Sequence, residues 1–416
     1  MNFTLIRRFA GPAIMAVLIA ACGSAATQTA APAALTLPPA GVTLVAPTQP
    51  PVTSAPQPAA ATSAPPTTVP AANPTPGGQI GPLNFPPNVD PLTGETVDPA
   101  ALDRIPVAIK VSNYPDVVRP QSGLSFADLV FEHFAEGGAT RFTAVFYSKD
   151  AEKVGSVRSA RLIDLEIPNM YHALLGYSGS SEGVRTLLKQ VPWLDRVMSP
   201  QFGEGCPPFC RFEEPGLALE HTEFTSTKDL RAIADQRGLN ERPDLHGMAF
   251  NATPPAGGQP AKQVTFPYNA SYVLWIYNAP AGRWLRWNTS SSNLTEHRDK
   301  LNGEQLSAAN VVALYANHVC NWAIIEDSNG WYSIEIQIWG SGPAKIFRDG
   351  QVYDATWVRN APTDMLGFVD ANNNPFPLKP GNTWFQLMQL ESPTKVENGN
   401  EWTIDPIEPG CVKTGG

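Results

Sequence analysis

No charged residue occurs between Arg8 and Asp90, and this gap constrains the chain more than any other feature of its sequence. From Ser24 to about Gly81 the chain consists mostly of Ala, Pro, Thr, Ser, Gln and Val, and it contains no aromatic residue. Such a segment cannot bury enough apolar surface to offset the entropy of ordering its backbone. We therefore expect residues 23–90 to form a disordered stalk with polyproline II character that precedes the folded part.

The start of the chain has the pattern of a bacterial export signal. Arg7 and Arg8 precede an apolar stretch, 9–21, that is too short to span a bilayer. Residues 18–22 have the sequence LIAAC, which resembles a lipobox, where the Cys is acylated and becomes the first residue of the mature protein. We predict that residues 1–22 are a lipoprotein signal peptide and that lipid on Cys22 anchors an extracytoplasmic protein to the cell membrane, because two acyl chains give stable anchoring. An ordinary secretory signal with an incidental Cys is the alternative.

Charge and motif content exclude some functions. The chain has 38 acidic and 29 basic residues, a net charge of −9, which argues against a nucleic-acid partner. Residues 370–375 begin like a calcium loop, but Pro375 stands where the loop needs Gly and Gly381 stands where it needs a bidentate Glu. We predict no metal and no cofactor.

Patterning in the first half of the folded part predicts strands alternating with short helices. Residues 106–111, 142–147 and 171–177 are rich in apolar and aromatic side chains, which is typical of strands. Residues 226–229 (STKD) resemble a capping box, and Gly238 ends the helical pattern that follows. This order predicts an α/β-type subdomain with a mixed sheet over 91–250.

The second half has mostly strand patterns. Residues 251–260 are rich in Pro and Gly and predict a linker, and the pair Asp349-Gly350 predicts a hairpin turn. The strands that we expect are 271–277, 311–316, 331–339, 352–358 and 384–390. We therefore predict an α+β fold whose C-terminal subdomain, 262–415, is β-rich.

Four cysteines remain once Cys22 is assigned to lipidation. An even number outside the cytoplasm favours disulfides, although four cysteines allow three connectivities. We favour Cys206–Cys210 within the sequence CPPFC, and Cys320–Cys411, which would tie the C-terminus to a strand. A zinc site formed by Cys206, Cys210 and His221 is the alternative, but its spacing matches no strong zinc pattern.

The densest group of polar residues lies between Phe131 and His221. If Ser156 or Ser159 began a helix, Arg158 and Arg161 would project from its first turns, where free N–H groups and guanidinium donors bind anions. With Glu136, Arg141, Ser181 and His221, these arginines form our candidate ligand site. The alternative is that the arginines form structural ion pairs with Glu132, Glu136 and Asp164.

A second hypothesis for this region is a hydrolase. Residues 179–183 (GSSEG) match the G-x-S-x-G pattern of a nucleophile elbow, in which Ser181 would be the nucleophile and His221 the base. Such short matches are common in Gly- and Ser-rich turns, and the same backbone N–H groups could instead line a binding nest.

Several motifs in order resemble those of the YerB-like lipoprotein family, which is catalogued as a domain of unknown function with N- and C-terminal parts. The motifs are 91–94 (PLTG), 118–125 (VRPQSGLS) with 127–128 (AD), 136–142 (EGGATRF), 155–161 (GSVRSAR) and 380–384 (PGNTW). The resemblance covers about 91–392 and implies an anchored extracytoplasmic protein, but no reaction.

The resemblance also bears on the candidate residues. The family's Gly-Gly-Ser stretch falls at 179–181, which favours Ser181 over Ser180. The family's His-Asn pair becomes His221-Thr222, and its Pro after Val-Gly becomes Ser156. We expect a tethered lipoprotein that binds an anionic ligand or an envelope protein, with the serine hydrolase as the alternative.

Overall fold

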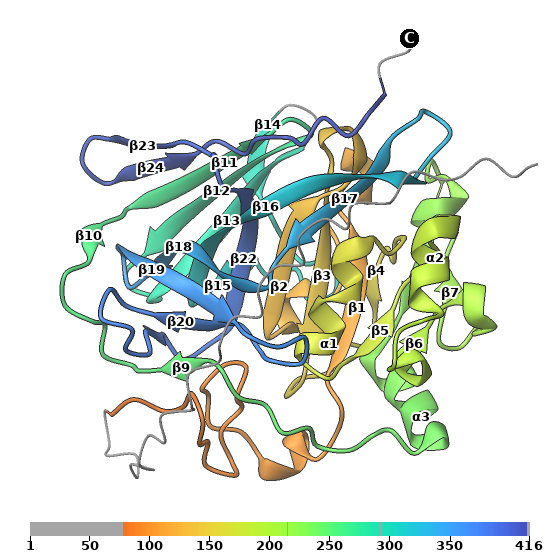
Figure 1. Ribbon diagram of the computed structural model, residues 1–416, viewed down its shortest axis with the longest axis horizontal. Helices are drawn as coiled ribbons and strands as arrows, with labels where there is room; N and C mark the ends of the chain where they lie inside the picture. The colour runs from red at the N-terminus through yellow and green to blue at the C-terminus, as the bar shows by residue number, and fades with distance from the viewer. Residues whose placement is uncertain (1–77, 214, 291–292, 414–416) are drawn as a thin grey trace, which may run out of the picture. The chain divides into compact units, whose positions relative to one another are not determined.

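Strands from both halves of the chain lie side by side in one large mixed sheet (Figure 1). Its order is β10-β19-β18-β16-β22-β2-β3-β1-β5-β6, with β17 paired to β16 and β20 paired to β19. The strands are β1 (Val107–Ser112), β2 (Leu129–Phe134), β3 (Thr140–Phe146), β5 (Leu174–Gly176), β6 (Val197–Met198), β10 (Gln259–Pro260), β16 (Asn310–Ile325), β17 (Tyr332–Gln337), β18 (Gly340–Arg348), β19 (Gln351–Arg359), β20 (Gly367–Val369) and β22 (Thr383–Gln389). β22 pairs in parallel with β2 on one side and with β16 on the other, so this late strand joins the two halves.

The computed structural model describes residues 78–213, 215–290 and 293–413. The predicted signal peptide, Cys22 and residues 23–77 of the predicted stalk lie outside this part of the chain.

The folded part begins earlier than composition indicated. Residues 78–90, which we assigned to the stalk, contact the rest of the fold: the Ile80 N–H donates to the Phe250 carbonyl at 2.8 Å, and Val89 and Asp90 are buried. We placed the start of the folded part where charged residues first appear. Composition missed residues 78–90 because their contacts are made by backbone groups and a few apolar side chains.

A second sheet has the order β14-β13-β12-β11-β24-β23, with β15 paired to β13. Its strands are β11 (Gln263–Tyr268), β12 (Ser271–Asn278), β13 (Arg283–Ser290), β14 (Asn293–Glu296), β15 (Ser307–Ala308), β23 (Thr394–Glu397) and β24 (Glu401–Ile404). Aromatic side chains pack the two sheets together: the ring centroid of Trp384 on β22 lies 5.3 Å from both Phe142 of β3 and Trp275 of β12. Large buried rings remove much apolar surface from water, so this contact stabilises the junction between the sheets.

Short elements complete the fold. The small sheets are β21 (Pro377–Leu378) with β9 (Ala249–Phe250), and β4 (Val154–Gly155) with β8 (Glu223–Thr225) and β7 (Cys210–Arg211). The α-helices are α1 (Ile167–Met170), α2 (Glu182–Leu188) and α3 (Thr227–Arg237). The 3₁₀ helices are η1 (Pro99–Leu102), η2 (Asp116–Val118), η3 (Leu124–Phe126), η4 (Glu136–Gly138), η5 (Leu162–Leu165), η6 (Leu194–Arg196), η7 (Pro200–Phe202) and η8 (Leu219–His221).

Local sequence signals located α3 correctly. The Ser226 hydroxyl accepts from the Asp229 N–H at 3.0 Å, and Gly238 ends the helix in a left-handed conformation with φ 67°. Asp349 and Gly350, with φ of 52° and 70°, connect β18 to β19 as the hairpin that we predicted.

The predicted strands of the second half are confirmed within one or two residues, apart from β16, which continues to Ile325. The strand predicted over 171–177 is only partly correct. Its first residues form a turn after α1, in which His172 has φ 48°, and only Leu174–Gly176 form β5. Apolar composition cannot distinguish a buried turn from a buried strand.

The fold is α+β, as predicted, with helices concentrated in the first half and strands in the second. The division into subdomains 91–250 and 262–415 stays a prediction.

Both predicted disulfides are present. Cys206–Cys210 has a Cα–Cα distance of 4.7 Å, and Cys320–Cys411 has one of 5.2 Å. Because Cys206 and Cys210 are bonded to each other, the zinc alternative with His221 is wrong.

Candidate functional site

Glu136 pairs with two arginines from other elements. It opens η4 directly after β2, whereas Arg141 lies on β3 and Arg161 precedes η5. Arg161 binds both carboxylate oxygens of Glu136, with Nη2 2.5 Å from Oε2, and Arg141 Nη2 lies 3.5 Å from the same oxygen. Burial raises the pKa of Glu136, but Arg161 and Arg141 outweigh it and lower the pKa to about 2.

A second carboxylate, Glu326, reaches this group from the β16–β17 hairpin. Its Oε2 lies 3.3 Å from Arg161 Nε, and its Oε1 accepts from the Ser333 hydroxyl. Burial raises the pKa of Glu326, and Arg161 only partly offsets this. We call Glu136, Arg141, Arg158, Arg161 and Glu326 the arginine cluster. Sequence reasoning missed Glu326 because only tertiary folding brings this hairpin to Arg161.

The helix that we considered at Ser156 or Ser159 does not form. Residues 156–158 are extended beside β1: the Arg158 N–H donates to the Lys110 carbonyl at 2.9 Å, and Val157 forms a β-bridge with Val111. A helical turn begins only after Arg161, whose N–H donates to Asp164 Oδ2 at 2.7 Å. β5 pairs with only the first three residues of β1, so the backbone groups of its last residues are free to bond residues 156–158. A helix at 156–158 would lose these hydrogen bonds, which is why this segment is extended.

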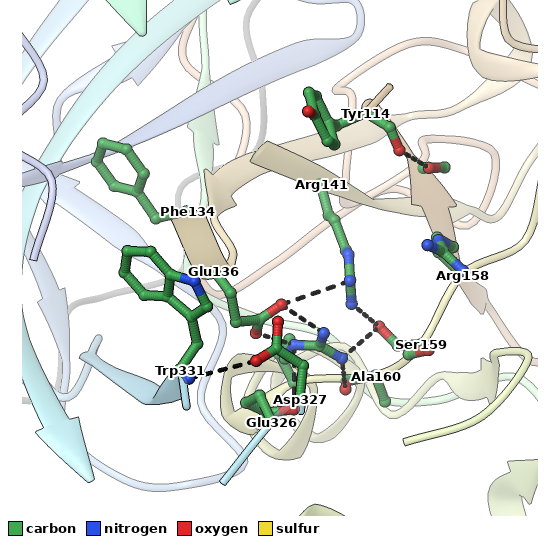
Figure 2. A network of polar contacts seen from close by, with 12 residues as sticks. Tyr114, Phe134, Glu136, Arg141, Arg158, Ser159, Ala160, Glu326, Asp327 and Trp331 are labelled. Carbon is green, nitrogen blue, oxygen red and sulfur yellow. Dashed lines mark hydrogen bonds and ion pairs between the residues drawn. The ribbon is translucent and has the colours of Figure 1, made fainter. Parts of the chain in front are cut away.

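Backbone carbonyls hold the guanidinium groups. Arg141 Nη1 donates to the Ser159 carbonyl at 2.8 Å, and Arg161 Nη1 donates to the Ala160 carbonyl at 2.8 Å (Figure 2). The ion-pair alternative therefore holds for Arg161 and Arg141, which pair with Glu136. It does not hold for Glu132, which pairs with Arg286 instead.

Arg158 differs from the other two arginines. Its nearest carboxylate is Glu220, with Nη2 3.8 Å from Oε1, and the Glu220 side chain is 60% exposed. Within the described residues, no group accepts a hydrogen bond from the buried Arg158 Nε. Burial lowers the pKa of Arg158, Glu220 raises it, and Arg161 lowers it further. Arg158 therefore keeps unused hydrogen-bonding capacity at its Nε.

Ser181 and His221 are held by separate interactions. The Ser181 hydroxyl caps α2 by accepting from the Val184 N–H at 3.4 Å. His221 ends η8, and its Nε2 lies 3.9 Å from Glu220 Oε1. Burial and Arg158 lower the pKa of His221. Over the described ranges no hydrogen bond joins Ser181 to His221, so the hydrolase stays a hypothesis.

A buried polar group lies next to the arginine cluster and was not predicted. The Lys110 ammonium lies 2.7 Å from Asp164 Oδ2 and 2.6 Å from His133 Nε2, and it donates to the Thr143 hydroxyl at 3.1 Å. Burial lowers the pKa of Lys110 to about 8, although Asp164 opposes this. Since Asp164 also accepts from the Arg161 backbone, this group positions the loop that carries Arg161.

Glu132 belongs to a different network, on the other face of β2. Its carboxylate pairs with Arg286 of the second sheet at 2.9 Å and accepts from Gln386 at 3.0 Å and Asn113 at 3.1 Å. Successive side chains along a strand point to opposite faces of the sheet, so the neighbours Glu132 and His133 on β2 contact different networks. Glu132 therefore joins the two sheets and takes no part in the arginine cluster.

Asp370 uses its carboxylate within its own turn, where Oδ1 accepts from the Asn372 N–H at 2.8 Å and the Asn374 N–H at 2.9 Å. In the parts of the chain that the structure describes, no group of three or more His, Cys, Asp or Glu side chains could hold a metal ion.

Two family models match this chain. One describes the N-terminal domain of the DUF3048 proteins of unknown function and matches residues 92–240, and the other describes their C-terminal domain and matches 263–385. The chain belongs to this family, which confirms the resemblance drawn from the motifs. The matched ranges include every member of the arginine cluster.

Bacillus subtilis provides both a sequence relative and a solved structure. The chain is 28% identical over 309 residues to the protein of strain 168 named "Putative lipoprotein YerB", which covers 74% of this chain and 88% of that protein. A crystal structure of YerB protein from Bacillus subtilis matches with a TM-score of 0.58 and 27% identity, covering 72% of this chain and 96% of that one. None of the helices in the described residues is long and apolar enough to span a membrane.

Proposed function

We propose that this protein is an extracytoplasmic lipoprotein, anchored through Cys22, that binds an anionic ligand or envelope partner at the arginine cluster. The LIAAC sequence and the name of the Bacillus subtilis relative support the anchor. The observation that carries the binding proposal is Arg158, whose Nε has no hydrogen-bond acceptor among the described residues and whose nearest carboxylate is an exposed one at 3.8 Å.

Local charge supports an anionic ligand even though the chain as a whole is acidic. Arg141 and Arg161 pair with Glu136, which stays ionised, and Arg161 also pairs with Glu326, whose pKa is raised. Arg158 adds a third positive charge close to Arg161. Burial lowers the pKa of Arg141 to about 9, and repulsion from the neighbouring Arg161 guanidinium contributes to this. An incoming carboxylate or phosphate would relieve this repulsion and supply the missing acceptor.

Fluorescence anisotropy with long-chain polyphosphate and poly-L-glutamate as labelled probes tests the proposal on the mature, unlipidated chain. We expect binding that weakens with added salt, because ions screen charges at the surface. Arg158→Gln removes the charge that has no close partner, so it should weaken binding by about tenfold, as expected for a lost charged hydrogen bond.

Arg298→Gln is the matched control, because it removes an exposed guanidinium that pairs with Glu296 outside the cluster. This variant should bind the probes like the wild type. Equal losses in the two variants, or no loss in Arg158→Gln, would show that the arginine cluster is not the binding site.

A further inference from the structure

A cavity of about 140 Å³ lies beside the arginine cluster, between four separate segments of the chain. It is bounded by η2 and the loop after it, by residues 155–156, by the segment from Leu217 to Phe224, and by Lys300. Its walls combine Val118, Pro120 and Phe224 with two polar residues, Ser156 and His221, and two cations, Arg119 and Lys300. Among its described lining residues there is no carboxylate.

Ser156 lines this cavity and has a fixed backbone. The Ser156 carbonyl accepts from the Ser112 N–H at 2.9 Å, and the flanking Gly155 exchanges two backbone hydrogen bonds with Ser122. Ser156 is only 3% exposed, yet no group in the described ranges bonds its Oγ. A buried hydroxyl without a partner is costly, so this position favours a bound acceptor.

His221 contributes a second group without a partner to the same cavity. It is 5% exposed, and its Nδ1 has no hydrogen-bond partner in the described part of the chain. Burial and Arg158 lower its pKa, so the imidazole is neutral near pH 7 and carries one N–H. In the Nδ1–H tautomer, this group is a donor that has no acceptor among the described residues.

One of the two cations on the wall, Arg119, is a rigid guanidinium. Arg119 donates to the Asn113 carbonyl at 2.7 Å and pairs with Asp116 at 2.9 Å, so it is held in place and its donors are occupied. It therefore contributes a positive potential, while Ser156 and His221 supply the hydrogen bonds. Two donors match the two oxygens of a carboxylate better than the larger oxygen set of a phosphate.

We propose that this cavity binds a single carboxylate group carried on a small apolar moiety. The inference deepens the proposed function, on which it rests: the arginine cluster attracts an anionic ligand, and the cavity selects one carboxylate of that ligand. The volume admits only a few non-hydrogen atoms, so the group is either a small free acid or the carboxylate end of a longer chain.

Saturation-transfer NMR on the mature, unlipidated chain tests this with propionate, its neutral analogue propionamide, and inorganic phosphate. We expect propionate to bind and the other two not to. Ser156→Ala and His221→Asn should each weaken propionate binding at least about tenfold, as expected for a lost hydrogen bond to a charged group. An acetylated dipeptide and its C-terminal amide form a second arm: binding of the acid form alone assigns the carboxylate to a chain end, and binding of propionate alone assigns it to a free acid.

Ser271→Ala is the matched control, because Ser271 on β12 is also buried and its hydroxyl also lacks a partner in the described residues. Equal binding of propionamide, or unchanged propionate binding in both cavity variants, would overturn the proposal. If the cavity variants bind propionate normally while Arg158→Gln loses polyphosphate, only the cavity proposal fails. If Arg158→Gln also binds polyphosphate normally, the proposed function fails as well.

Discussion

At the scale of single residues, Glu136 shows how a candidate ligand-binding group can be a structural one. Its carboxylate joins Arg161 and Arg141, and its side chain is only 10% exposed. Replacing it leaves two buried guanidinium groups without their main counter-ion, which is far more costly than losing an exposed ion pair.

We predict that Glu136→Gln destabilises the protein by about 3 kcal/mol at pH 7, measured by chemical denaturation. The pKa of Glu136 is about 2 in the folded state against a usual value of 4.5. Its stabilisation is therefore complete above pH 4.5 and is lost as pH falls toward 2, because the unfolded chain takes up the proton first. The wild type should lose stability more steeply than Glu136→Gln across that range.

Glu182→Gln is the control for that experiment, because Glu182 pairs with Arg185 at an exposed position. It should change neither the stability at pH 7 nor its dependence on pH. A Glu136→Gln variant as stable as this control would contradict the central role given to Glu136.

At the scale of elements, local sequence determines the backbone conformation of the hairpin turns. Asp349 and Gly350 adopt left-handed conformations, as do Asn398 and Gly399 in the turn between β23 and β24. The two turns differ in their surroundings. A Cβ on Gly350 would lie 2.8 Å from the Tyr277 ring, whereas a Cβ on Gly399 would meet nothing within 4 Å.

We predict that Gly399→Ala costs about 1–2 kcal/mol, the conformational cost of a left-handed alanine. Gly350→Ala should cost about 1–3 kcal/mol more, because Tyr277 must also move. Urea denaturation of both variants measures the difference. Equal losses would mean that the contact with Tyr277 carries no cost.

At the scale of the whole molecule, strands from the C-terminal half of the chain pair with strands from the N-terminal half in one sheet. β22 lies between β2 and β16, and the Glu132–Arg286 pair links this sheet to the second one. The Cys320–Cys411 disulfide further fastens the C-terminal segment to β16. These strand pairings, the ion pair and the disulfide thus hold the described residues of both halves together.

We predict that Cys22→Ser transfers the protein from the membrane fraction to the soluble fraction and abolishes incorporation of labelled palmitate. The melting temperature of the purified protein should not change, because the contacts that hold the described residues together do not involve Cys22. Ser24→Ala, two residues away, should keep both the label and the membrane association. Membrane sedimentation of Cys22→Ser would refute lipid anchoring at this residue.

Local features of the fold were predictable because neighbouring residues determine them. Ser226 and Gly238 bound α3 through a side-chain cap and a left-handed glycine, and Asp349-Gly350 turns the β18–β19 hairpin. The cluster was predictable only in part. Arg141, Arg158 and Arg161 lie in one dense stretch of sequence, whereas Glu326 reaches them from a distant hairpin that no local pattern connects to them.

The amino-acid sequence by itself determined the stretch without charge from 9 to 89, most of the strand and turn pattern, and the family, and it favoured one of the three cysteine pairings. These follow from composition, periodicity and motif, which are properties of adjacent residues. Only the tertiary structure decided that residues 156–158 are extended, that Ser181 caps a helix, and that Ser156 and His221 share a cavity. The physical reason is that hydrogen bonds and burial between distant segments outweigh weak local preferences once the chain is folded.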